Sequence, residues 1–133
     1  MKKDSIKSED YEKYYKQLIL KKIGVAGQKK ILKSKVLVVG AGGLGCPLIL
    51  YLAYSGVGNI GIVDNDKVEL SNLSRQILFT KKDIGKYKTS VSRNMIKKIN
   101  NKINGQPSPP APITKTFEFI IFFLSNNSNF FKN

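Results

Sequence analysis

Apolar residues recur along this chain in patterns that predict alternating helices and strands. Over residues 11–32 they recur at helical spacing, interrupted by Gly24 and Gly27, which predicts one or two short helices around a turn. Residues 35–40 form a continuous run rich in valine, as expected of a strand that is buried on both faces. The first third of the chain therefore predicts helices that pack against a buried strand.

The pattern after this strand predicts a complete strand–helix–strand unit. From Gly45 to about Gly58 apolar residues again follow helical spacing, and the glycines supply a stop signal. Residues 59–64 predict a second strand, so the two strands should be parallel with a right-handed crossover. A loop-like polar stretch follows, and then a helix is expected from Gly85 to about Lys102.

The two ends of the chain differ from the middle. Residues 1–10 are polar and expected to be disordered, and residues 105–116 have the composition of a linker. Residues 117–133 form an apolar and Asn-rich tail with two interpretations: a third strand on the open edge of the sheet, or sequence foreign to the domain, as from a truncated gene or an unspliced intron. The absence of a family pattern favours the second interpretation.

Composition and charge exclude several classes of function. The chain has 133 residues, no histidine and a single cysteine, which excludes histidine-based triads and histidine-ligated metals. The net charge of +14 arises from a lysine-rich background with only two arginines, Arg75 and Arg93, so nucleic acid is not an expected partner. No segment reaches the roughly 20 apolar residues that span a bilayer, and the N-terminus lacks the apolar core of a signal peptide. A cytoplasmic protein without a membrane partner is expected.

The motif that indicates a function is the glycine loop Gly40-Ala41-Gly42-Gly43-Leu44-Gly45. In such a loop the first glycine permits a tight turn, the second lets the backbone approach a phosphate, and the last lets helix and strand pack closely. Asp64 follows Gly45 by 19 residues, at the end of the second predicted strand, where a ribose-binding acid is expected. The motif predicts nucleotide binding; the alternative is that the glycines serve only the turn.

Three further motifs carry a resemblance to a known family. They are Asp64-Asn65-Asp66-Lys67-Val68-Glu69-Leu70-Ser71-Asn72-Leu73-Ser74-Arg75-Gln76, then Gly85-Lys86-Tyr87-Lys88, and upstream Tyr15-Lys16-Gln17-Leu18-Ile19-Leu20. Together with the glycine loop they resemble the ThiF/MoeB and ubiquitin-activating family of adenylating enzymes, over about residues 11–103. The resemblance is closest to molybdopterin-synthase sulfurylases and to activators of the modifier that acts in tRNA thiolation. It implies an α/β fold: a partial, Rossmann-like ThiF-type nucleotide-binding fold with parallel strands, whose N-terminal part is residues 11–104.

The resemblance also implies a reaction and its components. Enzymes of this family use ATP with Mg²⁺ to adenylate the C-terminal Gly-Gly carboxylate of a ubiquitin-like or sulfur-carrier protein, and they release pyrophosphate. A homodimer is implied for the complete form.

Roles for individual residues follow from the same resemblance. Asp64 is expected on the ribose hydroxyls and Asp66 near the metal shell, although Asp66 and Gln76 also suit a solvated surface. Lys16 aligns where the family carries an arginine that reaches the neighbouring subunit's ATP site; the alternative is an exposed helix lysine. Cys46 is expected to be a small buried residue. Phosphate contacts are implied for Asn72, Arg75 and Lys88, loop support for Gln76, and nucleotide binding for the loop glycines Gly40, Gly42, Gly43 and Gly45.

The family's remaining residues have no counterpart in this sequence. After Asp83 there is no further aspartate, whereas the family holds Mg-ATP with a later one, and Cys-x-x-Cys pairs are lacking too. We therefore expect the front portion of a larger enzyme, with no metal ligand of its own, that binds ATP weakly and does not turn over alone. The alternatives are a nicotinamide-dependent oxidoreductase and an inactive nucleotide-binding or dimerisation module.

Overall fold

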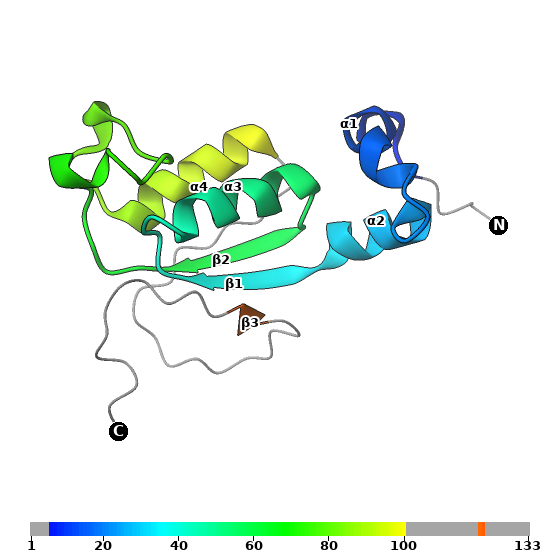
Figure 1. The fold of residues 1–133 in the computed structure, drawn as a ribbon, viewed down its shortest axis with the longest axis horizontal. Helices are drawn as coiled ribbons and strands as arrows, with labels where there is room; N and C mark the ends of the chain where they lie inside the picture. Colours follow the sequence, from blue (N-terminus) through cyan, green and yellow to red (C-terminus); the bar gives the residue numbers. More distant parts are fainter. Residues whose placement is uncertain (1–5, 101–119, 122–133) are drawn as a thin grey trace, which may run out of the picture.

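The fold is an α/β arrangement, shown in Figure 1 as a computed structural model that describes residues 6–100 and 120–121. Two helices precede the first strand, and a helix follows each of the first two strands. Two short 3-10 helices, η1 and η2, interrupt the long loop between β2 and α4. The elements are α1 Ser8–Leu18, α2 Gly24–Lys33, β1 Lys35–Val39, α3 Gly45–Ser55, β2 Asn59–Val63, η1 Leu70–Asn72, η2 Lys81–Asp83, α4 Lys88–Ile99 and β3 Ile120–Ile121.

The sheet is parallel, with the strand order β2-β1-β3. β1 and β2 pair over their full length, from Lys35 opposite Asn59 to Val39 opposite Val63. This confirms the predicted strand–helix–strand unit. β3 consists of two residues of the tail and pairs with the other edge of β1, with Ile120 opposite Leu37 and Ile121 opposite Val38.

Helices α3 and α4 lie side by side on one face of the sheet (Figure 1). α3 ends at Gly56, which has a φ of 92° in the left-handed region that favours glycine. Side chains from these two helices and from the facing positions of β1 and β2 form one hydrophobic core, which includes Val36, Val38, Ile49, Ala53, Ile60, Ile62, Val91 and Ile96. The core fixes the direction of both strands, whose carboxyl ends therefore meet at one edge of the sheet.

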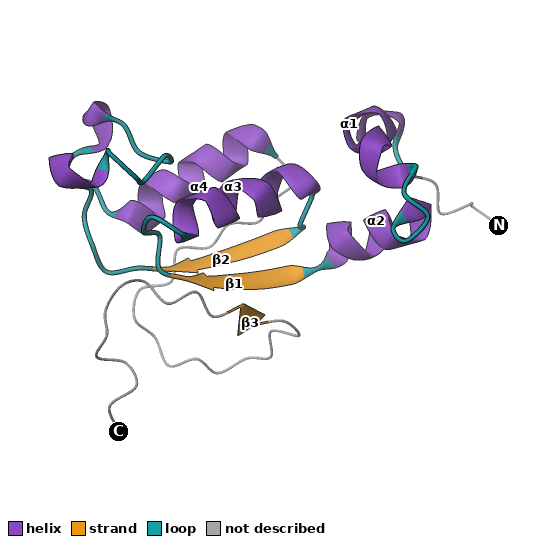
Figure 2. Cartoon of the chain, viewed as in Figure 1, coloured by secondary structure: helices purple, strands orange, loops and turns teal. Residues whose placement is uncertain are grey.

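Helices α1 and α2 are attached at the opposite end of the molecule, beside the C-terminal ends of α3 and α4 (Figure 2). The Tyr14 side chain is buried against Gly56, where an added Cβ would lie 2.7 Å from the Tyr14 ring. The side-chain amide of Gln28 donates to the Ser55 carbonyl at 3.0 Å, and Lys13 donates to the Ile99 carbonyl at 3.0 Å. These contacts hold the two N-terminal helices away from the glycine loop.

Three boundaries differ from the sequence predictions. α1 begins at Ser8, inside the stretch 1–10 that was expected to be disordered, because Glu9 and Asp10 favour the helix N-terminus and Asp10 is buried. α4 begins at Lys88 rather than at Gly85, because Gly85 has a φ of 85°, and it ends at Ile99 rather than at about Lys102, because Asn100 has an extended backbone. The predicted linker 105–116 and all but two residues of the tail 117–133 lie outside the described residues. No helix in the described part is long and apolar enough to cross a bilayer.

Candidate nucleotide site

The glycine loop joins the end of β1 to the start of α3, and each of three glycines has a distinct geometric reason. Gly40 has a φ of 91°, which the tight turn requires. A Cβ on Gly45 would lie within 1.9 Å of the Gly40 carbonyl oxygen, so the helix can approach the loop only with glycine there. A Cβ on Gly42 would meet nothing within 4 Å. The backbone at Gly42 therefore faces open space, as a phosphate-binding loop requires.

Asp64 connects the glycine loop to the end of β2 by hydrogen bonds. One carboxylate oxygen accepts the Ala41 N–H at 2.6 Å, and the other accepts the Asp66 N–H at 2.8 Å. The Gly40 N–H donates to the Val63 carbonyl at 2.7 Å and continues the strand pairing up to this point. Asp64 thus lies beside the loop, where the sequence placed it, and it also holds two loops in register.

Lys88 and Asp66 form an ion pair at the same edge of the sheet. The Lys88 ammonium lies 2.8 Å from an Asp66 carboxylate oxygen, and its own side chain is only 5% exposed whereas that of Asp66 is 71% exposed. The Lys88 N–H also donates to the Asp66 carbonyl at 3.0 Å. Asp66 therefore contacts a basic side chain, and among the described residues no group of three or more acidic, histidine or cysteine side chains is arranged to hold a metal.

The loop that carries Arg75 is built by a reciprocal capping box around η1. The Glu69 N–H donates to the Asn72 side-chain oxygen at 3.1 Å, and the Glu69 side chain in turn caps the Asn72 N–H. The Asn72 carbonyl then accepts the N–H groups of Arg75 and Gln76 at 3.1 and 2.9 Å. Asn72 and Gln76 are both buried; Asn72 shapes the loop through these bonds, whereas the buried side-chain oxygen of Gln76 has no hydrogen-bond partner within the described residues.

Arg75 itself is exposed and lies over the glycine loop. A Cβ on Gly43 would be 3.7 Å from the Arg75 Cγ and Cδ atoms, which is ordinary van der Waals contact. One guanidinium nitrogen donates to the Ser71 carbonyl at 3.0 Å. The structure therefore brings Arg75 to the glycine loop, next to a backbone that has space for an anion.

Lys16 is the one predicted site residue that the structure does not bring to this edge. It is exposed on α1, with its ammonium 5.9 Å from the centre of the Tyr15 ring. The α1 helix contacts the C-terminal end of α3, and the 11 residues of α3 separate that end from the glycine loop by about 16 Å. Lys16 therefore cannot serve the glycine loop of its own chain in this arrangement.

Cys46 is fully buried at the start of α3, as predicted, and its thiol donates to the Ala41 carbonyl at 3.3 Å. Burial raises the pKa of this thiol to about 11, although a backbone hydrogen bond at Leu78 and the Lys88 charge act in the opposite direction. A thiol that holds its proton so firmly is a poor nucleophile at neutral pH. Cys46 is thus a structural residue beneath the loop.

Two backbone hydrogen bonds at this edge of the sheet could not be predicted from the pattern of apolar residues. The Val68 N–H donates to the Lys86 carbonyl at 2.9 Å, and the Gly85 N–H donates to the Val68 carbonyl at 2.8 Å. They bind the segment after β2 to the segment before α4 and so bring Lys88 to Asp66. The buried Val68 is the only residue of the three whose apolar character could have suggested a packing role.

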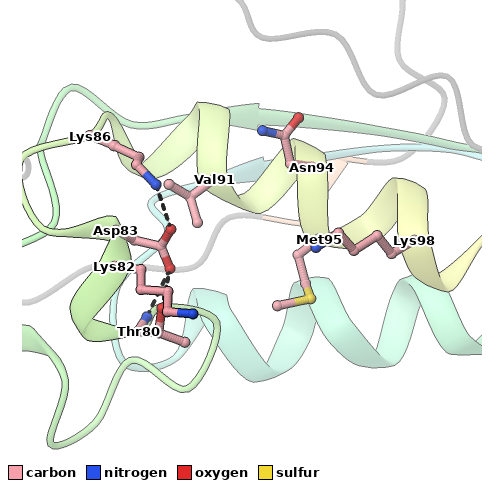
Figure 3. A pocket seen from close by; sticks show the side chains of 8 residues that line it. All are labelled: Thr80, Lys82, Asp83, Lys86, Val91, Asn94, Met95 and Lys98. Atoms are coloured by element: carbon pink, nitrogen blue, oxygen red, sulfur yellow. Dashed lines mark hydrogen bonds and ion pairs between the residues drawn. The ribbon is translucent and has the colours of Figure 1, made fainter.

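A separate hollow of about 370 Å³ lies between η2 and α4 (Figure 3). At its rim Asp83 accepts hydrogen bonds from the Thr80 hydroxyl and N–H, and it pairs with Lys86 at 3.1 Å. The Thr80 hydroxyl, together with the Thr80 N–H and Lys86, holds the pKa of the Asp83 carboxyl below its usual value. None of the glycine-loop residues lines this hollow, so it is distinct from the candidate nucleotide site. Its lining is Thr80, Lys82, Asp83, Lys86, Val91, Asn94, Met95 and Lys98.

The chain is similar in sequence to one family of known proteins. The model of the ThiF family matches residues 14–132. A probable molybdopterin-synthase adenylyltransferase from Porphyra purpurea is 51% identical over 98 residues, which cover 74% of this chain and 26% of that protein. The adenylyltransferase and sulfurtransferase UBA4 from Saccharomyces cerevisiae is 55% identical over 97 residues, which cover 72% of this chain and 22% of the relative. The chain thus spans about a quarter of the length of these relatives.

Solved structures agree with the sequence relatives. The crystal structure of E. coli MccB with ATP superimposes with a TM-score of 0.60 and 41% identity, over 61% of this chain and 24% of that one. The structure of PaaA gives a TM-score of 0.70 and 30% identity, over 78% of this chain and 34% of that one. Both the fold and the sequence therefore lead to the same group of proteins.

Proposed function

The chain belongs to the ThiF family, and from this we propose that it forms the nucleotide-binding part of an enzyme that uses ATP to adenylate the C-terminal carboxylate of a small protein. The observation that carries the proposal is the convergence at one sheet edge of the open backbone at Gly42, the Arg75 side chain and the Lys88 ammonium. The relatives are named adenylyltransferases, and one structural neighbour was solved with ATP.

The proposed reaction is attack by a carboxylate oxygen of the small protein on the α-phosphorus of ATP. A new acyl–phosphate bond forms, the bond from the α-phosphorus to the bridging oxygen breaks, and its electron pair leaves with pyrophosphate. The nucleophile is already an anion, so no general base is needed, which suits a chain without histidine. The remaining task is to position two polyanions and neutralise their charge.

Residues of this chain could perform that task in two ways, by binding phosphate oxygens and by neutralising negative charge. The backbone N–H groups at the N-terminus of α3 and the open face of Gly42 would hold phosphate oxygens, while Arg75 and Lys88 would neutralise negative charge from two different loops. Asp64 would orient the ribose while it holds the glycine loop. Mg²⁺ neutralises phosphate charge when bound with ATP, and its ligands are not assigned to the described residues.

The partner is proposed to be a ubiquitin-like or sulfur-carrier protein that ends in Gly-Gly. The motif resemblance supports this partner and a homodimer in the complete enzyme, and the relatives named adenylyltransferase and sulfurtransferase are consistent with a sulfur carrier. Lys16 would take part in the site only in such a dimer, because it lies too far from its own glycine loop. The alternative is an exposed helix lysine without a role in the site.

The first experiment measures nucleotide preference by titrating the 133-residue chain with ATP and with NAD in a heteronuclear NMR experiment. We expect ATP to shift backbone resonances of the glycine loop and to bind at least tenfold more tightly than NAD. Arg75→Ala should weaken ATP binding by about tenfold, as loss of a charge-assisted contact of roughly 1.5 kcal/mol implies. Lys81→Ala removes the same charge outside the site and serves as the matched control. Equal affinity for ATP and NAD would contradict the proposal.

The second experiment tests the chemistry in a complete enzyme. Residues 14–100 replace the corresponding segment of the yeast UBA4 relative, and ATP–pyrophosphate exchange is measured with a small protein that ends in Gly-Gly. The chimera should support exchange, and Lys88→Met within it should abolish exchange while the chimera still folds. A folded chimera without exchange would show that this segment does not supply an adenylation site.

A further inference from the structure

The Lys88 ammonium is a nearly buried charge with a solvent-facing partner. Its side chain is 5% exposed, and the Asp66 carboxylate that pairs with it at 2.8 Å is 71% exposed. Among the described residues, this is the one hydrogen-bond acceptor seen for the Lys88 ammonium. An ammonium group has three donors, so two of them remain for another acceptor.

The backbone of Asp66 is fixed from both sides. Its N–H donates to the Asp64 carboxylate at 2.8 Å, and its carbonyl accepts the Lys88 N–H at 3.0 Å. Asp64 in turn holds the Ala41 N–H of the glycine loop. The glycine loop, the end of β2 and the start of α4 are therefore joined through Asp66.

The difference in exposure between the two partners has a physical consequence. A buried ammonium needs a compensating negative group, because removing a charge from water without a partner is costly. The exposed Asp66 carboxylate can nevertheless be replaced easily as the partner of Lys88, since water screens its charge and weakens the ion pair. A second anion that reaches Lys88 would therefore displace or share the interaction at little cost.

We propose that Asp66 is a positioning residue for Lys88. Its carboxylate binds the Lys88 ammonium beside the glycine loop in the place of a phosphate, and a polyphosphate that binds there would replace it. This rests on the proposed function, because it assumes that phosphates lie near Lys88. It gives Asp66 a role through Lys88 in place of the metal-shell role that the sequence motif implied.

The test is the binding of inorganic tripolyphosphate and of ATP to the full chain, measured by NMR titration. Asp66→Asn keeps the shape and one acceptor oxygen but removes the competing charge, so polyphosphate binding should tighten by about three- to tenfold. Asp83→Asn is the matched control, because it removes a carboxylate from the Lys86 ion pair outside the site. Asp83→Asn therefore measures the effect of the same change in net charge at a position outside the site.

A double-mutant cycle with Lys88→Met separates positioning from general electrostatics. In the Lys88→Met background, Asp66→Asn should give no gain beyond that of Asp83→Asn. A purely structural role for Asp66 would instead weaken binding in Asp66→Asn, so the sign of the change distinguishes the two. The proposal is overturned if Asp66→Asn does not exceed the control, if the gain persists without Lys88, or if none of these chains binds tripolyphosphate.

Failure of the proposed function gives a different result. If tripolyphosphate binding follows the expected cycle but the chain shows no preference for ATP over NAD and the chimera supports no exchange, the adenylation assignment fails and the role of Asp66 stands. If ATP preference and exchange are observed while Asp66→Asn matches Asp83→Asn, the role of Asp66 fails and the adenylation assignment stands.

Discussion

The carboxylate of Asp64 accepts the backbone N–H of Ala41 at 2.6 Å, which ties the glycine loop after β1 to the end of β2. A carboxylate expected to bind ribose thus also holds the phosphate loop in place. Because the second oxygen of Asp64 accepts the Asp66 N–H at 2.8 Å, the same side chain also fixes the turn that follows β2.

Replacing Asp64 should therefore affect folding and binding together. Asp64→Asn can accept only one of the two hydrogen bonds, and loss of a hydrogen bond to a charged group is expected to lower the free energy of unfolding by about 1.5–3 kcal/mol. Urea denaturation measures this change, and ATP titration should show at least tenfold weaker binding. Asn65→Ala, at the exposed neighbouring position, should change neither quantity. Unchanged stability in Asp64→Asn would show that the tie to Ala41 contributes little.

Two alanine substitutions in the glycine loop should separate stability from binding. In Gly45→Ala the new Cβ would collide with the Gly40 carbonyl oxygen at 1.9 Å, so the start of α3 must move. We expect a loss of about 2–4 kcal/mol in the free energy of unfolding, in the range of severe steric changes.

Gly42→Ala is the matched substitution in the same loop. Its Cβ meets nothing within 4 Å, so stability should change by less than about 0.5 kcal/mol. ATP binding should nevertheless weaken by at least tenfold, because the methyl group fills the space that a phosphate would take. If Gly42→Ala binds ATP as the wild-type chain does, the open face at Gly42 is not the phosphate site.

The position of Arg75 over Gly43 predicts that a positive charge alone does not suffice for ATP binding at this position. Arg75→Lys keeps the charge but loses the planar set of donors, one of which is committed to the Ser71 carbonyl. We expect Arg75→Lys to recover less than half of the binding free energy lost in Arg75→Ala. Isothermal titration with ATP measures this recovery, and full recovery would mean that Arg75 acts only as a point charge.

The Cys46 thiol predicts a pH dependence of stability. Burial raises its pKa to about 11, so above the ordinary thiol pKa the unfolded chain loses this proton while the folded chain keeps it. The free energy of unfolding should be highest below that ordinary value and fall as the pH rises towards 11, by about 2 kcal/mol for this group.

Cys46→Ala isolates the contribution of the thiol from the lysines and tyrosines that titrate in the same range. The difference in unfolding free energy between the wild-type chain and Cys46→Ala should shrink between about pH 9 and pH 11. A constant difference over this range would show that the thiol is not buried in solution.

Local patterns in the sequence determined the elements and one half of the site. The valine run of β1 and the helical spacing after Gly45 are preferences of neighbouring residues, so they predict structure without knowledge of the rest of the chain. Gly40 and Asp64 could be placed for the same reason, since the carboxyl ends of two parallel neighbouring strands must meet at one edge of the sheet.

Only the tertiary structure decided how the long loop between β2 and α4 returns to that edge. The Lys88–Asp66 pair joins residues 22 positions apart, and the capping box of Glu69 and Asn72 depends on backbone turns that have no hydrophobic period. The structure likewise places Lys16 at the far end of α3, although the motif associates it with an ATP site. Contacts of this kind are set by the path of the backbone and the burial of a few polar groups, which a linear pattern of apolar residues does not encode.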